Sequence, residues 1–552
     1  MSNPLTSLEQ AFTFNKMAAM NNDTPDVLII GAGATGSAAA WSLSQSNISV
    51  MCLDQGDWVR PSQYHTNEID WELSRWSDFH PDPNHRSLSA DYPIDNSETP
   101  IAPLMYNAVG GSTIHWGAHF PRFHPSDFKV RSLDGVAEDF PYGYEDLVPF
   151  FDLNDRMMGV SGLDGDPFYP PKSTRPMPPL AIGRHGETIA RGFDKLGWHW
   201  WPADAAIATT QYREGQLPCN YGSSCDLGCG TGARASTDQT YWPPALQNGV
   251  VLKTQARVRT LLVGKNNRIE SVLYHKDGRL YEQRARNVIV ACNGIGTPRL
   301  LLNSSSNQFP DGLANQSGLV GKNLMFHPAA FVTGYFDDPM ETNYGPVSNS
   351  IYSHHFYETD DTRGFVRGYQ FQITRGSGPL WTALGGTRGK HIPWGIDHHK
   401  VFEKQFNHSL NIAVLTEDLP EEHNQVTIDP LLTDSDGIPS PKTTYRIGDN
   451  TNKMLDHGID RATEVLQAAG AHEVSIYRVP KLGGWHLMGT ARTGSDPDRS
   501  VVDGWGKAHS IPNLFLIDGS VLVTSGAVNV TSTIQAIALR TADYIKRNRR
   551  VL

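Results

Sequence analysis

One histidine and one asparagine near the C-terminal end could together take a proton from an alcohol. His486 follows Gly483, Gly484 and Trp485, and Asn529 lies in the segment GAVNVT. Oxidation of an alcohol removes a hydride from carbon and a proton from oxygen. Histidine suits the proton step because its pKa is near neutral, and a carboxamide can hydrogen-bond the substrate oxygen. A structural histidine and a helix-capping asparagine are the alternatives.

A glycine-rich turn near the N-terminus predicts a dinucleotide-binding site. Gly31, Gly33 and Gly36 lie between the apolar run DVLII and a helix-forming segment, and Asp54 ends a second apolar run, ISVMCL. In such βαβ units the glycines permit a tight turn, the approach of a pyrophosphate and close helix packing, and a later carboxylate binds the ribose. The motif alone does not choose between NAD and FAD, although its early position favours FAD. A glycine turn in an ordinary α/β protein is the alternative.

Three of the five cysteines lie in one glycine-rich loop. Cys219, Cys225 and Cys229 have the spacing C-x5-C-x3-C. Three thiolates can bind iron and sulfide, whereas zinc would need a fourth ligand that the neighbouring sequence lacks. Free thiols are the alternative. Cys52 and Cys292 each lie at a predicted core strand, so we expect them to be buried as small hydrophobic residues.

The order of several motifs resembles the glucose–methanol–choline (GMC) family of flavin oxidoreductases over nearly the whole chain. The resemblance lies in GAGATG at 31–36, AVGGSTIHW at 108–116, TPRLLLNS at 297–304, VGKNLMFHP at 320–328, WHLMGTARTG at 485–494 and the segment 518–545. It implies FAD as cofactor, hydride transfer to flavin N5, His486 as base and Asn529 as the second active-site residue. It also implies cofactor contacts from Gly110, Gly111, Ser112, Thr113, Val258, Asp518, Gly519, Asn529, Val530 and Thr531. The family usually has proline where this chain has Val530.

Two segments resemble particular branches of that family. His115 matches the position at which pyranose oxidases attach FAD covalently, but related sugar dehydrogenases share a similar stretch without an established bond. Covalent attachment and simple packing against the flavin edge therefore both stay open. The cysteine spacing is similar to that of the 3Fe-4S cluster in catalytic subunits of membrane-linked sugar dehydrogenases, although Gly230 departs from it. This likeness implies a cytochrome c acceptor and a small escort subunit.

These residues need a fold that brings distant segments together. We predict an α/β (α+β overall) fold with a Rossmann-like FAD-binding domain, interleaved with a substrate domain built on an antiparallel sheet. The FAD-binding domain is predicted at 24–60, 100–125, 219–330 and 481–552, and the substrate-binding domain with its covering loops at 61–99, 126–218 and 331–480.

Local patterns predict several elements of these domains. Strands are expected at FVTGYFD, FVRGYQFQIT and NHSLNIAVLTED, hairpin strands near 250–290, and irregular structure over 130–215. The residues before Asp26 are expected to form a loose arm or short helix. The last helix is expected to begin with a capping box of Ser532 and Gln535, and to end among Lys546, Arg547, Arg549 and Arg550.

Composition excludes several classes of protein. The chain has 552 residues and a net charge of −11, which argues against a nucleic-acid-binding protein. No apolar run approaches the roughly 20 residues of a transmembrane helix. The N-terminus lacks the pattern of a secretory signal. A cytoplasmic location is therefore the default expectation, with a periplasmic or membrane-peripheral one if a partner subunit carries the export signal.

The sequence thus predicts an FAD-dependent oxidoreductase that oxidises a secondary alcohol of a sugar or glycoside to a ketone. Electrons would pass to an external acceptor. The first alternative is an oxygen-using pyranose or glycoside 3-oxidase that makes hydrogen peroxide, and the second is a redox-neutral FAD-containing lyase. A noncatalytic flavoprotein is a weaker alternative, against which His486 and Asn529 together argue.

Overall fold

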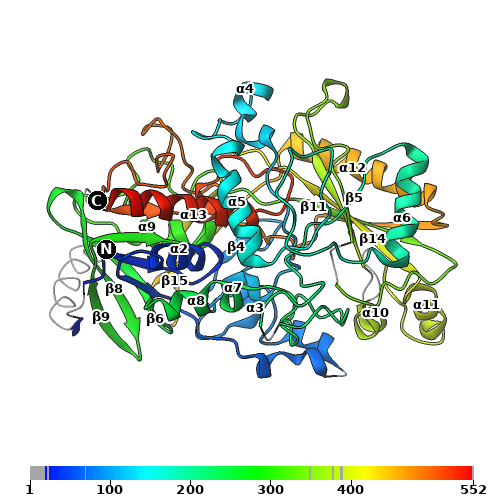
Figure 1. Cartoon of the computed structure of the whole chain (residues 1–552), viewed down its shortest axis with the longest axis horizontal. Coiled ribbons are helices and arrows are strands. Elements are labelled where there is room, and N and C mark those ends of the chain that lie inside the picture. The colour runs from blue at the N-terminus through cyan, green and yellow to red at the C-terminus, as the bar shows by residue number, and fades with distance from the viewer. Residues whose placement is uncertain are drawn as a thin grey trace.

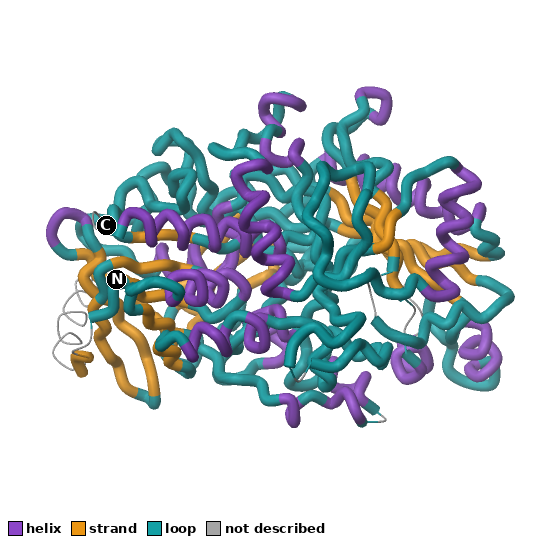
Figure 2. Tube along the Cα trace, viewed as in Figure 1, coloured by secondary structure: helices purple, strands orange, loops and turns teal. Residues whose placement is uncertain are grey.

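The computed structural model describes residues 19–21, 24–68, 70–214, 216–346, 350–375, 378–385 and 390–549. Two strand-rich regions lie toward opposite ends of the long axis, with loops and helices between them (Figures 1 and 2). The predicted N-terminal arm falls largely outside the described residues.

A five-stranded parallel sheet forms the first region. Its order is β18-β10-β2-β3-β6, and its strands are β2 (Val27–Ile30), β3 (Val50–Leu53), β6 (Val251–Lys253), β10 (Asn287–Val290) and β18 (Leu514–Leu516). Four of them are buried along their whole length, as expected for a parallel sheet covered on both faces. The sheet joins the beginning, middle and end of the chain, which confirms the predicted Rossmann-like fold.

Helices flank this sheet and a meander extends the region. The helices are α2 (Ala34–Ser44), α9 (Asn293–Leu302) and α13 (Thr531–Asn548), and α2 packs against α13. The predicted hairpins are β7 (Arg257–Val263), β8 (Ile269–Lys276) and β9 (Arg279–Arg284). Strand β1 (Ala19–Asn21) pairs with β9 in parallel, so a strand forms before Asp26, where a loose arm or short helix was expected.

A six-stranded antiparallel sheet forms the second region. Its order is β17-β11-β14-β13-β12-β5, and its strands are β5 (Trp201–Pro202), β11 (Ala329–Tyr335), β12 (Ile351–Ser353), β13 (Tyr369–Thr374), β14 (Ser409–Thr416) and β17 (Glu473–Arg478). Helix α12 (Asp449–Ala468) packs on β11 and β14, and α6 (Gly183–Leu196) packs on α12. The antiparallel substrate sheet is therefore confirmed.

The alternation in β13 positions polar groups for the site. Tyr369, Phe371 and Ile373 belong to the hydrophobic core beneath α12, so Gln370 and Gln372 lie on the opposite face. All six residues of this strand are buried. A polar row that is buried must find partners within the protein.

A three-stranded sheet and several short helices complete the fold. The sheet has the order β15 (Gln425–Thr433), β16 (Pro439–Thr444), β4 (Asp95–Glu98). The other α-helices of the described residues are α3 (Pro83–Arg86), α4 (Val130–Asp134), α5 (Tyr144–Met158), α7 (Thr237–Thr240), α8 (Trp242–Gln247), α10 (Pro379–Gly385) and α11 (His398–Gln405).

Two local predictions were wrong. The region 130–215, expected to be irregular, contains the long helices α5 and α6; Pro149 lies within α5 and obscured it. The capping box is also absent from the described start of α13, because the helix begins at Thr531 and Ser532 lies inside it. Gln535 instead donates a hydrogen bond to the Ala34 carbonyl of α2.

The predicted domain segments agree with the strands they contain, but their boundaries stay a prediction. All five parallel strands fall inside the segments assigned to the FAD-binding domain, whereas the strands of the six-stranded sheet fall in or within two residues of the other set. Helix α5, from the substrate-side segment 126–218, packs on α13 of the parallel-sheet region.

Arg367 ties three distant segments together by buried ion pairs. Its guanidinium donates to Glu417 at 2.9 Å, to Asp134 at 3.2 Å and to Asp127. The side chains of Arg367, Asp127 and Glu417 are at most 1% exposed. Because these carboxylates are buried away from water, loss of the Arg367 guanidinium would leave their negative charges without a partner.

We predict that Arg367→Met destabilises the FAD-loaded enzyme by about 3–5 kcal/mol, the usual cost of breaking a buried pair. The control Arg184→Met removes a surface pair with Asp338 and should cost less than about 1 kcal/mol. Urea unfolding followed by protein fluorescence measures both. Equal midpoints for the two variants would contradict this account.

Candidate active site

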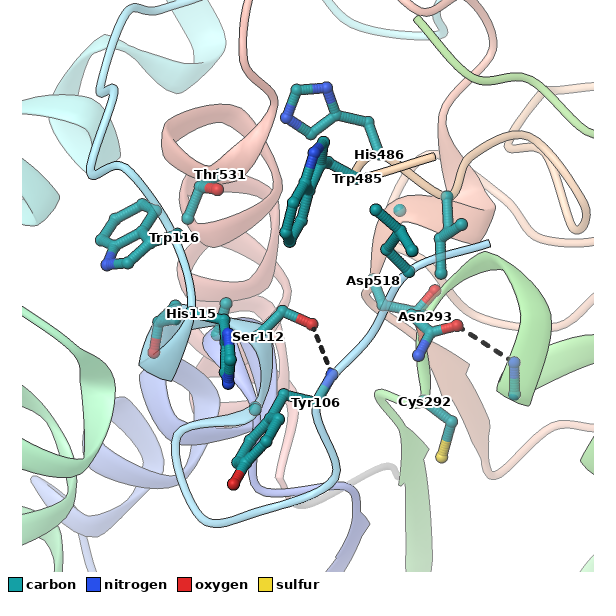
Figure 3. A pocket seen from close by; sticks show the side chains of 18 of the residues that line it. Tyr106, Ser112, His115, Trp116, Cys292, Asn293, Trp485, His486, Asp518 and Thr531 are labelled. Atoms are coloured by element: carbon teal, nitrogen blue, oxygen red, sulfur yellow. Dashed lines mark hydrogen bonds between the residues drawn. The ribbon is translucent and has the colours of Figure 1, made fainter. Parts of the chain in front are cut away.

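A cavity of about 410 Å³ lies between the two sheets. Ile30 and Leu53, at the carboxyl ends of β2 and β3, line one side, and Phe331 of β11 and Gln372 of β13 line another. Open α/β sheets bind nucleotides at the carboxyl ends of their strands. Figure 3 shows His486 and Trp485 at one end of this cavity, away from Cys292 and Tyr106.

Two glycine loops meet in the wall of the cavity. A side chain added at Gly111 would come within 2.9 Å of the Cα atom of Gly33, so Gly111 must be bare for the loops to touch. At Gly36, an added Cβ would lie 1.9 Å from the Gly31 carbonyl oxygen. Gly36 and Gly110 are absent from the described lining and instead shape the backbone, Gly110 through a φ of 99°.

Two helix N-termini open onto the same cavity. No described side chain caps α2 or α13, whose first turns contribute Ala34 and Thr531 to the lining. Buried Ser532 Oγ also has no hydrogen-bond partner among the described residues. Helix ends of this kind bind phosphates through their unpaired N–H groups and their dipole. These groups fit the pyrophosphate of FAD.

Two buried carboxylates stand at strand ends beside the glycine loops. Asp54 accepts hydrogen bonds from the backbone N–H groups of Ala32 at 2.6 Å and Gly56 at 2.7 Å, and burial raises its pKa to about 6. Asp518 accepts from Thr297 at 2.6 Å and from the Ser520 N–H. Each carboxylate keeps lone pairs for ligand hydroxyls.

The remaining predicted cofactor residues also line the cavity. They are Ser112, Thr113, His115, Val258, Gly519, Asn529 and Val530. Ser112 Oγ accepts from the Tyr106 N–H at 3.2 Å (Figure 3), and Thr113 Oγ1 donates to the Gly110 carbonyl at 2.6 Å. The cavity therefore gathers nearly all the residues predicted to hold FAD.

His115 is buried under aromatic rings. Its ring centroid lies 4.4 Å from that of Tyr106 and 5.4 Å from that of Phe79. Its Nε2 atom is buried without a hydrogen-bond partner among the described residues, and burial lowers its pKa well below 6.5. A neutral ring with an unused nitrogen fits either flavin packing or attachment.

His486 faces a second histidine that the sequence did not single out. Met325 and Met488 form an antiparallel bridge, and that register places His327 opposite His486. The two Nδ1 atoms are 2.6 Å apart, and the rings meet at 84°. His327 Nε2 lies 2.7 Å from the Gly526 carbonyl oxygen, which can only accept.

This contact fixes the tautomer of both rings. His327 must carry its proton on Nε2, so its Nδ1 accepts from His486 Nδ1–H. The Nε2 lone pair of His486 is then available as a base. Burial lowers the pKa of His327 to about 4, and burial, His327 and His119 hold the pKa of His486 well below 6.5. Both rings are therefore neutral near pH 7.

A chain of amides orients Asn529. Gln372 Nε2 donates to Asn529 Oδ1 and to Gln370 Oε1, each at 2.6 Å, and Gln370 Nε2 donates to His354 Nε2 at 2.6 Å. With its oxygen occupied, Asn529 presents Nδ2 to the cavity, 3.4 Å from His486 Nε2. A donor and a base thus lie side by side, as alcohol oxidation needs.

The cysteine loop borders the cavity through Asp226, whereas its three cysteines are absent from the described lining. Among the described residues, no three His, Cys, Asp or Glu side chains are arranged to hold a metal ion together. Cys219 and Cys229 pack beside Met177, Ala208 and Ala233, and each thiol accepts a backbone N–H bond. The predicted 3Fe-4S cluster at these cysteines therefore stays a prediction.

Of the two remaining cysteines, Cys52 is buried in its strand as expected. Cys292 instead lines the cavity (Figure 3), so its prediction as a buried core residue was wrong.

Two signals could have pointed to the missed residues. His327 lies within VGKNLMFHP, and Gln370 and Gln372 form the polar half of the alternating YQFQIT. Neither pattern reveals which side chain contacts His486, because that contact depends on the register between two distant segments.

Comparison with known proteins identifies the family. The profile described as GMC oxidoreductase matches residues 185–329 with its N-terminal part and 420–538 with its C-terminal part, and a Rossmann-like NAD(P)-binding profile matches 29–92. The chain is 41% identical to 2-methyl-1,2-propanediol dehydrogenase of Mycolicibacterium austroafricanum, covering 95% of this chain and 96% of that one. The chain belongs to the GMC oxidoreductase family.

Other relatives also match over nearly the full length of both chains. The fructose dehydrogenase large subunit of Gluconobacter japonicus is 30% identical, over 95% of this chain and 99% of that one. A solved pyridoxine 4-oxidase superposes with a TM-score of 0.66 at 16% identity, over 95% of this chain and 99% of that one, which shows a shared fold. The protein is thus an FAD-dependent oxidoreductase acting on alcohol CH–OH groups. No helix within the described residues is both long and apolar enough to cross a membrane.

We predict that His327→Ala slows anaerobic flavin reduction by about 10²-fold or more, since the wrong tautomer of a histidine base costs up to about 10⁴-fold. His327→Asn keeps an acceptor near the position of Nδ1 and should recover most of that loss. Stopped-flow absorbance measures both, with FAD content as the control. Equal rates in the two variants would refute the tautomer account.

Proposed function

We propose that the protein oxidises one alcohol group of a polyhydroxylated substrate to a carbonyl group, with His486 as base, and passes the electrons to an external acceptor. The observation that carries this proposal is the pairing of a proton-accepting His486 Nε2 with the Asn529 amide donor in a cavity that fits FAD. Sugars and glycosides, oxidised at a secondary alcohol, remain the finer hypothesis for the substrate.

The residues act in a fixed order. The substrate hydroxyl donates to His486 Nε2, while its oxygen accepts from Asn529 Nδ2–H. His486 takes the proton, and its Nδ1–H bond to His327 spreads the new positive charge over a second ring. FAD, when bound, supplies the acceptor for the hydride that leaves the carbinol carbon. Asn529 stabilises the oxygen as negative charge develops on it.

Relatives support a substrate with several hydroxyl groups. Their names include 2-methyl-1,2-propanediol dehydrogenase, a fructose dehydrogenase and the 6'''-hydroxyparomomycin C oxidase of Streptomyces lividus, which is 30% identical over 94% of this chain and 91% of that one. These compounds differ in size but share adjacent hydroxyl or amino groups. We therefore favour a diol or sugar over a simple alcohol.

The electron acceptor separates the dehydrogenase from the oxidase. Relatives carry both names, and the large-subunit name of one supports a partner chain for electron transfer. The cytochrome c route by an iron cluster is a separate hypothesis, which measurement of iron and acid-labile sulfide in the purified protein would test. Hydrogen peroxide formed under air in step with substrate would establish the oxidase alternative. Its absence, with turnover of an artificial acceptor, would establish the dehydrogenase.

We predict that His486→Ala slows anaerobic flavin reduction by about 10²–10⁴-fold, the range for a lost general base, while FAD stays bound. The measurement uses a panel of diols, sugars and glycosides. The control His472→Ala changes a half-exposed histidine outside the cavity lining and should reduce at the wild-type rate. A wild-type rate of flavin reduction in His486→Ala would show that His486 is not the base. A wild-type flavin that no alcohol bleaches would favour the lyase.

Because the pKa of His486 is lowered, we predict that the rate of flavin reduction does not fall between pH 8 and pH 6. A base works only when deprotonated, and an ordinary imidazole of pKa about 6.5 would be about three-quarters protonated at pH 6. Because burial, His327 and His119 keep His486 neutral there, the second-order rate of flavin reduction should stay level from pH 8 to pH 6. A fall by half near pH 6.5 would contradict this expectation.

A further inference from the structure

A third histidine lines the cavity without taking or giving a proton in the proposed reaction. His119 lies in the lining together with His486 and Asn529. It follows the short 3-10 turn of Gly111–Ile114, and Ala118 before it adopts a φ of 59°. His119 and Ala205 form an isolated antiparallel bridge, so the backbone that presents the ring is held in place.

Hydrogen bonding sets the tautomer of His119. Its Nδ1 lies 2.6 Å from the Tyr352 hydroxyl oxygen, and that hydroxyl donates to the Asp204 carbonyl oxygen at 3.3 Å. With the phenol hydrogen in the bond to the carbonyl, we assign His119 Nδ1–H as the donor to the phenol oxygen. The Nε2 atom of His119 therefore carries a lone pair.

The charge state of His119 matches this arrangement. Burial lowers its pKa to about 3, so the ring is a neutral acceptor at physiological pH. After burial and His327, His119 is a further group that disfavours the protonated form of His486 and so lowers its pKa, which indicates that the two rings lie near each other. A neutral acceptor in a cavity wall binds a hydroxyl or amino group that donates to it.

A polar side chain without a hydrogen-bond partner among the described residues also lines this cavity. Thr374 lines the cavity two residues beyond Gln372 on the polar face of β13, and its buried Oγ1 has no partner among the described residues. The groups that bind the reacting alcohol, His486 Nε2 and Asn529 Nδ2, are distinct from these two. The cavity thus offers more polar contacts than one hydroxyl group can use.

We propose that His119 determines specificity by accepting, at Nε2, a hydrogen bond from a second hydroxyl group next to the carbinol that is oxidised. This inference rests on the proposed function and narrows its substrate class to vicinal diols and polyols. A mono-alcohol of the same size would leave His119 without a donor. A site whose polar group is left unpaired discriminates strongly against the analogue that lacks the partner.

The test compares matched alcohols in the FAD-loaded enzyme. One pair is 2-methyl-1,2-propanediol and 2-methyl-1-propanol; the other is 1,5-anhydroglucitol and its 2-deoxy analogue. The second-order rate of anaerobic flavin reduction is measured for each, in wild type, His119→Phe and His119→Gln. We expect the wild type to prefer the member with adjacent hydroxyls in at least one pair.

His119→Phe should lower the rate with that preferred member by about 10–100-fold, the cost of one unpaired buried polar group. The rate with its deoxy partner should change far less, so that the preference collapses. His119→Gln keeps a side-chain acceptor and should restore part of the preference, which a merely structural defect would not. FAD content and the unfolding midpoint show that each variant is folded.

The outcomes separate the two proposals. A preference that persists in a folded, FAD-loaded His119→Phe would overturn the role of His119 and leave the proposed function standing. Equal rates with both members of each pair in the wild type would do the same. A wild-type flavin that none of the four alcohols reduces, and that no other alcohol reduces either, would overturn the proposed function and this inference with it.

Discussion

The hydrogen bond between the Nδ1 atoms of His327 and His486 is the constraint on which the site depends. Two nitrogens 2.6 Å apart share one hydrogen, and the Gly526 carbonyl decides which ring supplies it. That choice leaves the lone pair of His486 on Nε2, next to the Asn529 amide. Every later step, from substrate orientation to proton uptake, uses this arrangement.

The two sheets divide the work of building the site. The parallel sheet brings glycine loops, helix N-termini and buried carboxylates to one side of the cavity, which suits a dinucleotide. The antiparallel sheet supplies the polar row of β13, and Gln372 in that row fixes the orientation of Asn529. Because Asn529 lies two residues before α13, the substrate side and the cofactor side meet at this one residue.

Secondary-structure elements could be predicted from the sequence better than the contacts between distant segments. Gly31, Gly33 and Gly36 follow a local pattern, so the turn and the parallel strands around it could be predicted from residues alone, and the motifs of the GMC family pointed to His486 and Asn529. The partner of His486 could not be found this way, since the bridge of Met325 with Met488 sets it across the fold. The cysteine spacing leaves a similar question open: Cys219 and Cys229 lie in one small cluster, and the iron cluster stays a prediction. Pro149 hid helix α5 because proline is rare within helices.

The most direct test is to locate the hydrogens on the two rings. A neutron diffraction map of the deuterium-exchanged enzyme near pH 7 should show deuterium on His486 Nδ1 and His327 Nε2, and none on His486 Nε2. Deuterium on His486 Nε2 would contradict the account, because the resting ring would then have no lone pair for the substrate proton.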